Sequence, residues 1–190
     1  MFLRAIITSE TRAVTCIAIK LMALTFVCTS ELMGAEWHEI DLEAKQWRIT
    51  AERMKMKSPH IVPLATQALE LLTTLKEITG WSVYLFPREH DPKKTMSNNT
   101  ILQALKRMGY QGKMTGHGFR GIASTVLHEQ GYTHEHIELQ LAHAPRNSVS
   151  AAYNHALYLQ PLTVMMQQLA DYLGELKAGA KVIQLHGKSA

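Results

Sequence analysis

The chain has 190 residues, of which 46% are hydrophobic and 19% are charged, values that exclude a disordered or low-complexity protein and fit one globular domain. Lys and Arg outnumber Asp and Glu by 20 to 16, and the net charge of +4 permits a polyanionic partner without requiring one. No internal repeat divides the chain, and no Pro/Gly/Ser-rich linker does so.

The first predicted element is a helix over residues 13–27, an apolar stretch that Lys20 interrupts. The lysine and the lack of a small-x-small cleavage site argue against a signal peptide, and the stretch is too short to span a membrane. Cys16 falls in this predicted helix and Cys28 at its end, so helical geometry places them about 18 Å apart. A disulfide needs roughly 4–7 Å between Cα atoms, so the thiols are predicted to be reduced and the chain cytoplasmic.

Residues 36–64 change to short strand-like runs separated by polar turns. Runs at residues 39–42, 46–49 and 60–63 predict a small three-stranded antiparallel sheet. The connection at residues 54–59 is basic and carries Lys55, so it is expected to form an exposed hairpin tip.

The rest of the chain is predicted to be helical, which makes the fold class α+β and mainly helical. Helices are expected at residues 68–78, 101–108, 117–131 and 135–141, with a loop around residues 87–92 and Ile122 facing inward. A short helix at residues 149–153 and a separate long helix after Pro161 follow. The tail at residues 180–185 could form a lone strand.

His117 and Arg120 lie three residues apart, so they share a face in the first turn of a predicted helix, where the helix dipole favours an anion. An exposed helix cap would give the same pattern. His143 at a helix end and Tyr153 on the next helix are each more often structural than catalytic. Tyr158 is a rival to Tyr153, but five residues turn it about 140° away on a helix.

The histidines also raise the question of a metal site, and with it a metal-dependent nuclease. Neither H-E-x-x-H nor paired cysteines are present, so zinc is not predicted. Phosphate-loop and dinucleotide-binding glycine motifs are also absent from the sequence.

Taken together, these residues resemble the catalytic domain of a tyrosine recombinase of the phage integrase family, as found in satellite phages and bacterial genomic islands. The resemblance covers nearly the whole chain. Its markers in chain order are Leu24–Leu32, Gly34–Trp37, Arg53–Lys57, Val62–Leu64, Tyr84–Pro87, His117–Arg120, Leu141–His143 and Ala151–Asn154. It implies the DNA breaking-rejoining fold with its small three-stranded sheet.

The resemblance also implies roles for particular residues. Tyr153 would attack the scissile phosphate of DNA and hold it as a 3′-phosphotyrosine. Arg120, His117 and His143 would bind the non-bridging oxygens, with His117 also handling the proton of the tyrosine. Lys55 would protonate the leaving 5′-oxygen.

Two further positions support the site or depart from the family pattern. Glu31 matches an acidic position that supports the site indirectly. Cys28 stands where the family carries a second arginine, and a mostly neutral thiol offers one weak donor. Loss of one preorganised donor costs about 10²–10³ in rate. The resemblance therefore predicts a recombinase domain impaired at Cys28, and neither a metal nor another cofactor is implied.

The expected organisation is one catalytic domain over residues 1–190, without the arm-binding and core-binding domains that such integrases carry before it. The expected partner is double-stranded DNA at attachment sites, with a monomer in solution and an oligomer on DNA. No membrane association is expected, and the location would be cytoplasmic and nucleoid-associated in a bacterium. The alternative is a non-catalytic DNA-binding or assembly module that keeps the integrase fold.

Overall fold

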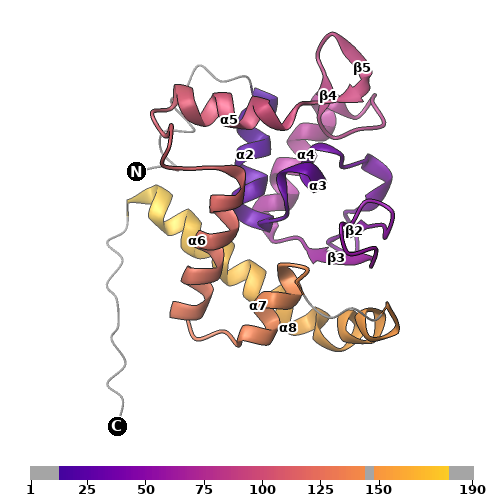
Figure 1. Cartoon of the computed structure of the whole chain (residues 1–190), viewed down its shortest axis with the longest axis vertical. Coiled ribbons are helices and arrows are strands. Elements are labelled where there is room, and N and C mark those ends of the chain that lie inside the picture. The colour runs from indigo at the N-terminus through magenta and orange to yellow at the C-terminus, as the bar shows by residue number, and fades with distance from the viewer. Residues whose placement is uncertain (1–12, 144–147, 180–190) are drawn as a thin grey trace.

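A computed structural model describes residues 13–143 and 148–179, and for residues 148–157 it describes the backbone alone. Helix α2 (Ala13–Thr25) runs through the middle of the molecule and packs, besides the short helix that follows it, against four longer helices (Figure 1). These are α4 (Thr66–Thr79), α5 (Asn98–Arg107), α6 (Gly116–Glu129) and α8 (Ser148–Ala178). Neighbours on several sides explain why α2 is apolar nearly all round, and the predicted buried helix is confirmed.

The predicted three-stranded antiparallel sheet is confirmed, with the order β1-β2-β3. The strands are β1 (Ile40–Asp41), β2 (Gln46–Ile49) and β3 (His60–Pro63). Trp47 on β2 lies opposite Ile40 and Val62, and Ile49 lies opposite His60. Trp47 and Ile49 are almost fully buried while Arg48 between them is exposed, so the sheet presents one face to the core.

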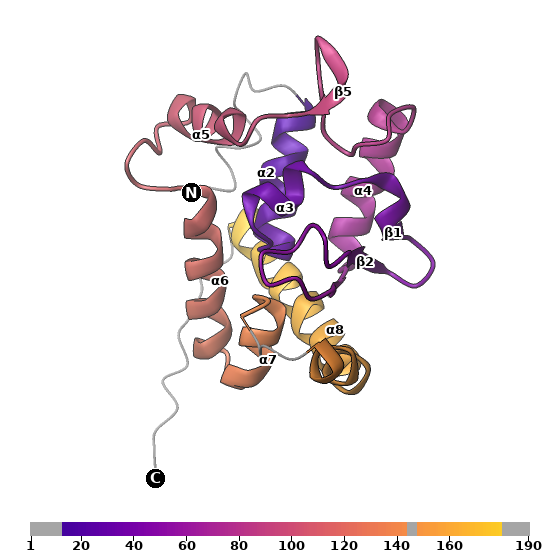
Figure 2. The same cartoon turned by 45° about the vertical axis from the view of Figure 1, so that its right-hand side comes forward.

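Short elements connect these parts. Helix α3 (Thr29–Met33) and the 3-10 helix η1 (Trp37–Glu39) join α2 to the sheet, and α7 (His134–Gln140) joins α6 to α8. Figure 2 shows α3 lying against α2, on the side where the sheet begins.

Three details of the predicted layout are wrong. Residues 87–95 form an antiparallel hairpin of β4 (Pro87–Arg88) and β5 (Asp91–Thr95) instead of a loop. Ile122 is 53% exposed instead of inward-facing. Cys28 lies beyond the end of α2, at the start of α3, because Phe26 leaves the helix with a left-handed φ of 39°.

The predicted break at Pro161 is also wrong, because α8 continues through it. Proline in a helix interior costs roughly 3 kcal/mol. Pro161 itself is exposed, and buried side chains follow it at helical spacing and pack against α6 and α7. Their burial outweighs one lost hydrogen bond. The possible strand at residues 180–185 lies outside the described residues.

The core has two parts. The larger cluster surrounds α2 and contains the inner face of the sheet, α4 and α5. The smaller one joins Phe26 to α6, α7 and α8. The end of α2 therefore lies at the junction of the two clusters, and the candidate site is built there. Within the described segments, no helix combines the length and the apolarity needed to cross a bilayer.

Candidate active site

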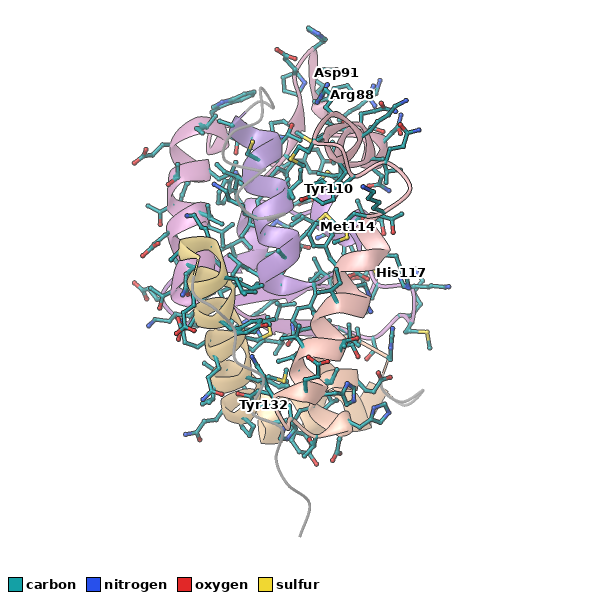
Figure 3. The ribbon with its side chains drawn as sticks, turned by 90° about the vertical axis from the view of Figure 1, so that its left-hand side faces the viewer. Arg88, Asp91, Tyr110, Met114, His117 and Tyr132 are labelled. Carbon is teal, nitrogen blue, oxygen red and sulfur yellow. The ribbon has the colours of Figure 1, made fainter. Side chains whose placement is uncertain are left out.

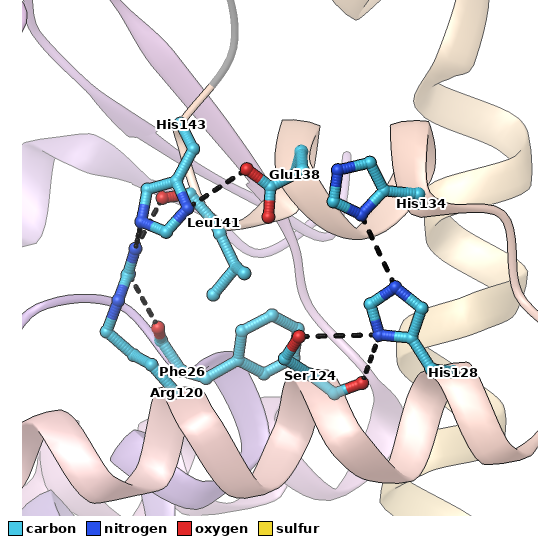
Figure 4. Close-up of polar contacts among 8 residues, drawn as sticks. All are labelled: Phe26, Arg120, Ser124, His128, His134, Glu138, Leu141 and His143. Atoms are coloured by element: carbon cyan, nitrogen blue, oxygen red, sulfur yellow. Dashed lines mark hydrogen bonds and ion pairs between the residues drawn. The ribbon is translucent and has the colours of Figure 1, made fainter.

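Arg120 is the centre of the site, on the face of α6 that points toward the end of α2. The residue is only 5% exposed, yet its guanidinium has precise partners. One terminal nitrogen donates to the Phe26 carbonyl at 2.9 Å, and the other donates to the Leu141 carbonyl at 2.5 Å (Figure 4). Two main-chain dipoles thus orient the group, while its Nε makes no hydrogen bond within the described residues.

Both carbonyls are directed at Arg120 by unusual backbone. Phe26 has φ of 39°, and Ala142, which directly follows Leu141, has φ of 52°. Ala142 ends α7 in the manner of a Schellman cap, with its N–H donating to the Leu139 carbonyl and the next N–H donating to the Glu138 carbonyl. Residues other than glycine are uncommon at positive φ, and such strain concentrates at functional sites.

His143 completes this corner. Its Nε2 lies 3.0 Å from a terminal nitrogen of Arg120, and its Nδ1 lies 3.2 Å from Oε2 of Glu138. These contacts fit a tautomer in which Nδ1–H donates to the carboxylate, leaving Nε2 beside the guanidinium. The imidazole is exposed, so an anion arriving from solvent can contact it directly beside the guanidinium.

Cys28 sits at the start of α3, and the thiol is half-buried. Its backbone N–H donates to Oε2 of Glu31 at 2.8 Å. Burial raises the pKa of the Cys28 thiol above its usual range, and the Glu31 carboxylate raises it further, whereas the positive charges of Arg120 and Lys55 oppose the rise. The thiol is therefore neutral at pH 7, and these electrostatic contributions place it in the field of both cations.

The start of α6 is pressed against α3. A Cβ added at Gly116 would lie 2.0 Å from Oγ1 of Thr29, so only glycine permits this approach. Thr115 caps the helix by accepting from the Gly118 N–H at 3.1 Å. His117 follows in the first turn, and its side chain is exposed at that end of α6 (Figure 3). The predicted helix start is confirmed, and His117 makes none of the contacts that hold Arg120.

Lys55 lies in the β2–β3 connection, as predicted, and is exposed together with Met56 and Lys57. The connection is nevertheless anchored, because Met54 is only 4% exposed and successive turn hydrogen bonds run through it. The expectation of an exposed tip therefore holds for Lys55 but is wrong for Met54.

Tyr153 lies on the first turns of α8, and its side chain is outside the described residues. The hydroxyl of Tyr158 donates to Glu135 at 2.9 Å. That hydrogen bond raises the pKa of Tyr158, with burial and the Glu135 charge adding to it. Since α8 is continuous, the two tyrosines lie about 140° apart around the helix. The Tyr158 hydroxyl is thus hydrogen-bonded to a residue of α7.

Metal ligation finds no support in residues 13–143 and 148–179, where no group of three or more His, Cys, Asp or Glu side chains is placed to hold an ion. His128 and His134 approach each other, with 3.4 Å between ring nitrogens, but they form only a pair. The described site is instead suited to an anion: a fixed guanidinium, an imidazole and a neutral thiol at the junction of α2, α6 and α7.

Comparison with known proteins decides the family. Residues 2–160 match the model of the phage integrase family. The chain belongs to the phage integrase family. It is 46% identical over 188 residues to the integrase of Enterobacteria phage P4, covering 90% of this chain and 43% of that protein. It is 41% identical over 160 residues to the prophage integrase IntA of Escherichia coli K12, covering 84% of this chain and 39% of that protein.

Solved structures agree on the fold. The integrase of mycobacterium phage Brujita superposes with a TM-score of 0.67 at 15% identity, covering 87% of this chain and 54% of that one. XerA recombinase gives a TM-score of 0.61 at 18% identity, covering 94% and 62%. The resemblance to the tyrosine recombinase fold is confirmed. The chain spans about two fifths of the length of the curated integrases it matches.

The structure brings together some of the predicted site residues. Arg120 and His143 are in contact, and Cys28 lies in the field of Arg120 beside Glu31. Lys55 is connected to them by its electrostatic effect on Cys28 alone.

Sequence reasoning missed the main-chain carbonyls of Phe26 and Leu141, for which side-chain identity gives no signal. It also missed Glu138, five residues before His143, whose carboxylate orients the imidazole. It also gave no structural partner to Arg53, two residues before Lys55, whose guanidinium donates to the main-chain carbonyl of Glu31.

Proposed function

We propose that this integrase domain cleaves and rejoins double-stranded DNA through a covalent bond to Tyr153. The phenol oxygen attacks the scissile phosphorus and the P–O5′ bond breaks, which leaves a 3′-phosphotyrosine and a 5′-hydroxyl. His117 accepts the phenol proton, and Lys55 donates a proton to the departing 5′-oxygen. The phosphotyrosine keeps the energy of the original phosphodiester, so attack by a 5′-hydroxyl rejoins the strand without a nucleotide or a metal.

The observation that carries this proposal is the environment of Arg120. Its positive charge is buried and held by carbonyl groups, and no carboxylate within the described residues forms an ion pair with it. A buried cation without a counter-ion is costly, and an incoming phosphate would relieve that cost. With a proton on each ring nitrogen, His143 would donate from Nε2 to the same phosphate while its Nδ1–H stays on Glu138.

Cys28 is proposed to weaken the reaction without preventing DNA binding. The raised pKa keeps the thiol neutral, and its proton is shared with Glu31, so little of its donor capacity is directed at a phosphate. Charge on the non-bridging oxygens grows in the transition state, and loss of one preorganised donor costs about 10²–10³ in rate. We expect the same order of impairment in this chain.

The proposal is tested by trapping the covalent intermediate on a nicked DNA substrate that carries the attachment-site core from the DNA flanking the gene. The Cys28→Arg chain should form a protein–DNA adduct that Tyr153→Phe abolishes. Tyr158→Phe is the matched control, because its hydroxyl is bonded to Glu135, and it should leave the adduct intact. An adduct that survives Tyr153→Phe would contradict the proposal.

Cys28 also favours a second candidate, a DNA-binding or assembly module that keeps the fold without catalysis. DNA as partner is supported by the Tn1549 transposon integrase, solved in complex with a circular intermediate DNA, which superposes with a TM-score of 0.61 at 13% identity, covering 80% of this chain and 57% of that one. Salt-sensitive duplex binding, with no adduct even after Cys28→Arg, would select the module. Both candidate functions carry the same two further expectations, that the chain assembles into an oligomer on DNA and that it is located at the nucleoid.

A further inference from the structure

A second, partly buried arginine lies next to the candidate active site, in the connection that carries Lys55. Arg53 is 20% exposed at its side chain, and its Nη1 pairs with Oε2 of Glu39, a carboxylate whose side chain is 1% exposed. The same oxygen accepts from the Trp47 indole N–H at 3.1 Å and from the Glu36 backbone N–H at 3.2 Å. Glu39 is thus held by three donors from separate segments and offers a fixed anchor.

The other end of the Arg53 fork reaches the active site. Its Nη2 donates to the main-chain carbonyl of Glu31 at 2.5 Å. Glu31 is the residue whose carboxylate accepts from the Cys28 N–H. One planar group therefore joins the anchored Glu39 to the segment that carries Cys28, and Lys55 follows Arg53 by two residues.

The surrounding backbone is shaped to accept this guanidinium. A Cβ added at Gly34, at the end of α3, would lie 3.0 Å from Nη2 of Arg53 and 3.3 Å from the Ser30 carbonyl. Glycine at this position lets the fork lie flat against the end of α3. An alanine would press on the guanidinium without removing any of its partners.

Stability alone is a weak explanation for this arrangement. Apolar side chains of similar volume often stabilise a core as well as a buried ion pair does. A rigid fork with two partners in fixed directions has a property that apolar groups lack, because it sets the distance between the segments that it bridges. Here those segments are the Lys55 connection and the start of α3.

We propose that Arg53, anchored by Glu39, is a positioning residue that sets the reach of Lys55 toward the leaving 5′-oxygen. This inference rests on the proposed function, in which Lys55 transfers its Nζ proton to that oxygen as the P–O5′ bond breaks. General acid catalysis contributes about 10²–10⁴ in rate and depends on placement within hydrogen-bond reach. If the β2–β3 connection lost the Arg53–Glu39 pair, Lys55 would still be present but would no longer be held within reach of the 5′-oxygen.

The chemistry of the leaving group separates positioning from general damage. With sulfur in place of the bridging 5′-oxygen, the departing group is a thiolate, which is a far weaker base than an alkoxide and leaves without a proton. A variant that harms only proton donation should therefore be slow on the oxygen substrate and restored on the sulfur substrate. A variant that disturbs the phosphate site should be slow on both.

The experiment measures the rate of covalent adduct formation on nicked oxygen and sulfur substrates, with the Cys28→Arg chain as the reference. The variants are Arg53→Lys, Gly34→Ala and the double variant Arg53→Met/Glu39→Gln. The double variant replaces Arg53→Met because removing both charged groups leaves no buried charge unpaired, so the domain can still fold. Lys55→Ala is the positive control for loss of the acid. Arg48→Met is the matched control, because Arg48 is a 59% exposed arginine of the same sheet that pairs only loosely with Asp41, at 3.8 Å.

We expect the Arg53 variants to lose about 10²-fold on the oxygen substrate, as Lys55→Ala does, and to recover to within a few-fold of the reference on the sulfur substrate. Gly34→Ala should show the same pattern more weakly, and Arg48→Met should change neither rate. Equal losses on both substrates, or no loss on oxygen, would overturn the inference. Sulfur rescue of Lys55→Ala without rescue of the Arg53 variants would overturn it while leaving the proposed function intact. If the reference chain forms no adduct with either substrate, the proposed function fails, and the inference fails with it.

Discussion

Arg53 and Arg120, the two arginines at the candidate site, have opposite surroundings. Arg53 has a buried carboxylate, Glu39, as its partner, so its charge is neutralised inside the protein. Arg120 is held by two carbonyls and touches an imidazole, and within the described residues it has no carboxylate partner. Arg120 is the more deeply buried of the two, yet among the described residues a carboxylate neutralises Arg53 and none neutralises Arg120.

The difference suggests how to separate structural from ligand-binding cations in a single chain. A neutralised guanidinium contributes position, because its charge and its fixed hydrogen bonds are directed at partners within the fold. A guanidinium whose partners are main-chain carbonyls and an imidazole keeps its positive potential for an anion from solvent.

The largest effect on stability should come from Arg53→Met. This change leaves the Glu39 carboxylate buried without its counter-ion, which typically costs about 3–5 kcal/mol. Denaturant unfolding should show that loss, and Arg53→Met/Glu39→Gln should recover much of it. Equal stability of the single and double variants would mean that Glu39 is not an uncompensated charge once Arg53 is gone.

Arg120→Lys should affect activity more than stability, the opposite of what is expected for Arg53→Met. A lysine keeps the charge but cannot reach both carbonyls and a phosphate, so adduct formation in the Cys28→Arg chain should fall about 10²–10³-fold. The free energy of unfolding should change less than in Arg53→Met. A stability loss at Arg120 that exceeds the one at Arg53 would remove the distinction between the two arginines.

A smaller effect is expected at the backbone that directs the Leu141 carbonyl. Ala142→Gly relieves a positive φ of 52° and should raise the free energy of unfolding by roughly 1 kcal/mol. Gly131→Ala is the matched opposite, since Gly131 has φ of 86° with open space around its Cα, and it should destabilise the domain. Thermal unfolding measures both, and a destabilised Ala142→Gly would show that the strain has been assigned wrongly.

The smallest effect concerns pH. The folded-state pKa of Cys28 is raised, chiefly by burial and then by Glu31, so the fold favours the neutral thiol. The stability from this group is fully present below the ordinary thiol pKa and is lost as pH rises through the raised value. Unfolding measured between pH 7 and 10 should therefore show a steeper alkaline decline for the native chain than for Cys28→Ser. Parallel curves would contradict the shift.

Much of the fold could be predicted from the sequence, and less of the site. The three-stranded sheet followed from alternation at Gln46–Ile49, and α2 followed from its apolar run. The helix break predicted at Pro161 was wrong because local propensity does not include the burial of the side chains that follow the proline in α8. The β4–β5 hairpin was missed because its polar residues show no alternation.

At the site, residue types identified Arg120 and His143 but not what orients them. The carbonyls of Phe26 and Leu141 act through backbone conformation, which side-chain patterns do not encode. Arg53 and Glu39 are 14 positions apart, and only the folded sheet brings them together. Long-range pairing of this kind follows from tertiary structure.

The most direct test of the account asks whether Cys28 weakens the site because a positive charge is missing. Adduct formation should be measured for the native chain and for Cys28→Arg on nicked DNA with an ordinary scissile phosphate. It should be repeated with a methylphosphonate there, which replaces one charged non-bridging oxygen by a neutral methyl group. The arginine should raise the rate at least about 10²-fold on the phosphate and by only a few-fold on the methylphosphonate. The same gain on both substrates, or no gain on the phosphate, would contradict the account.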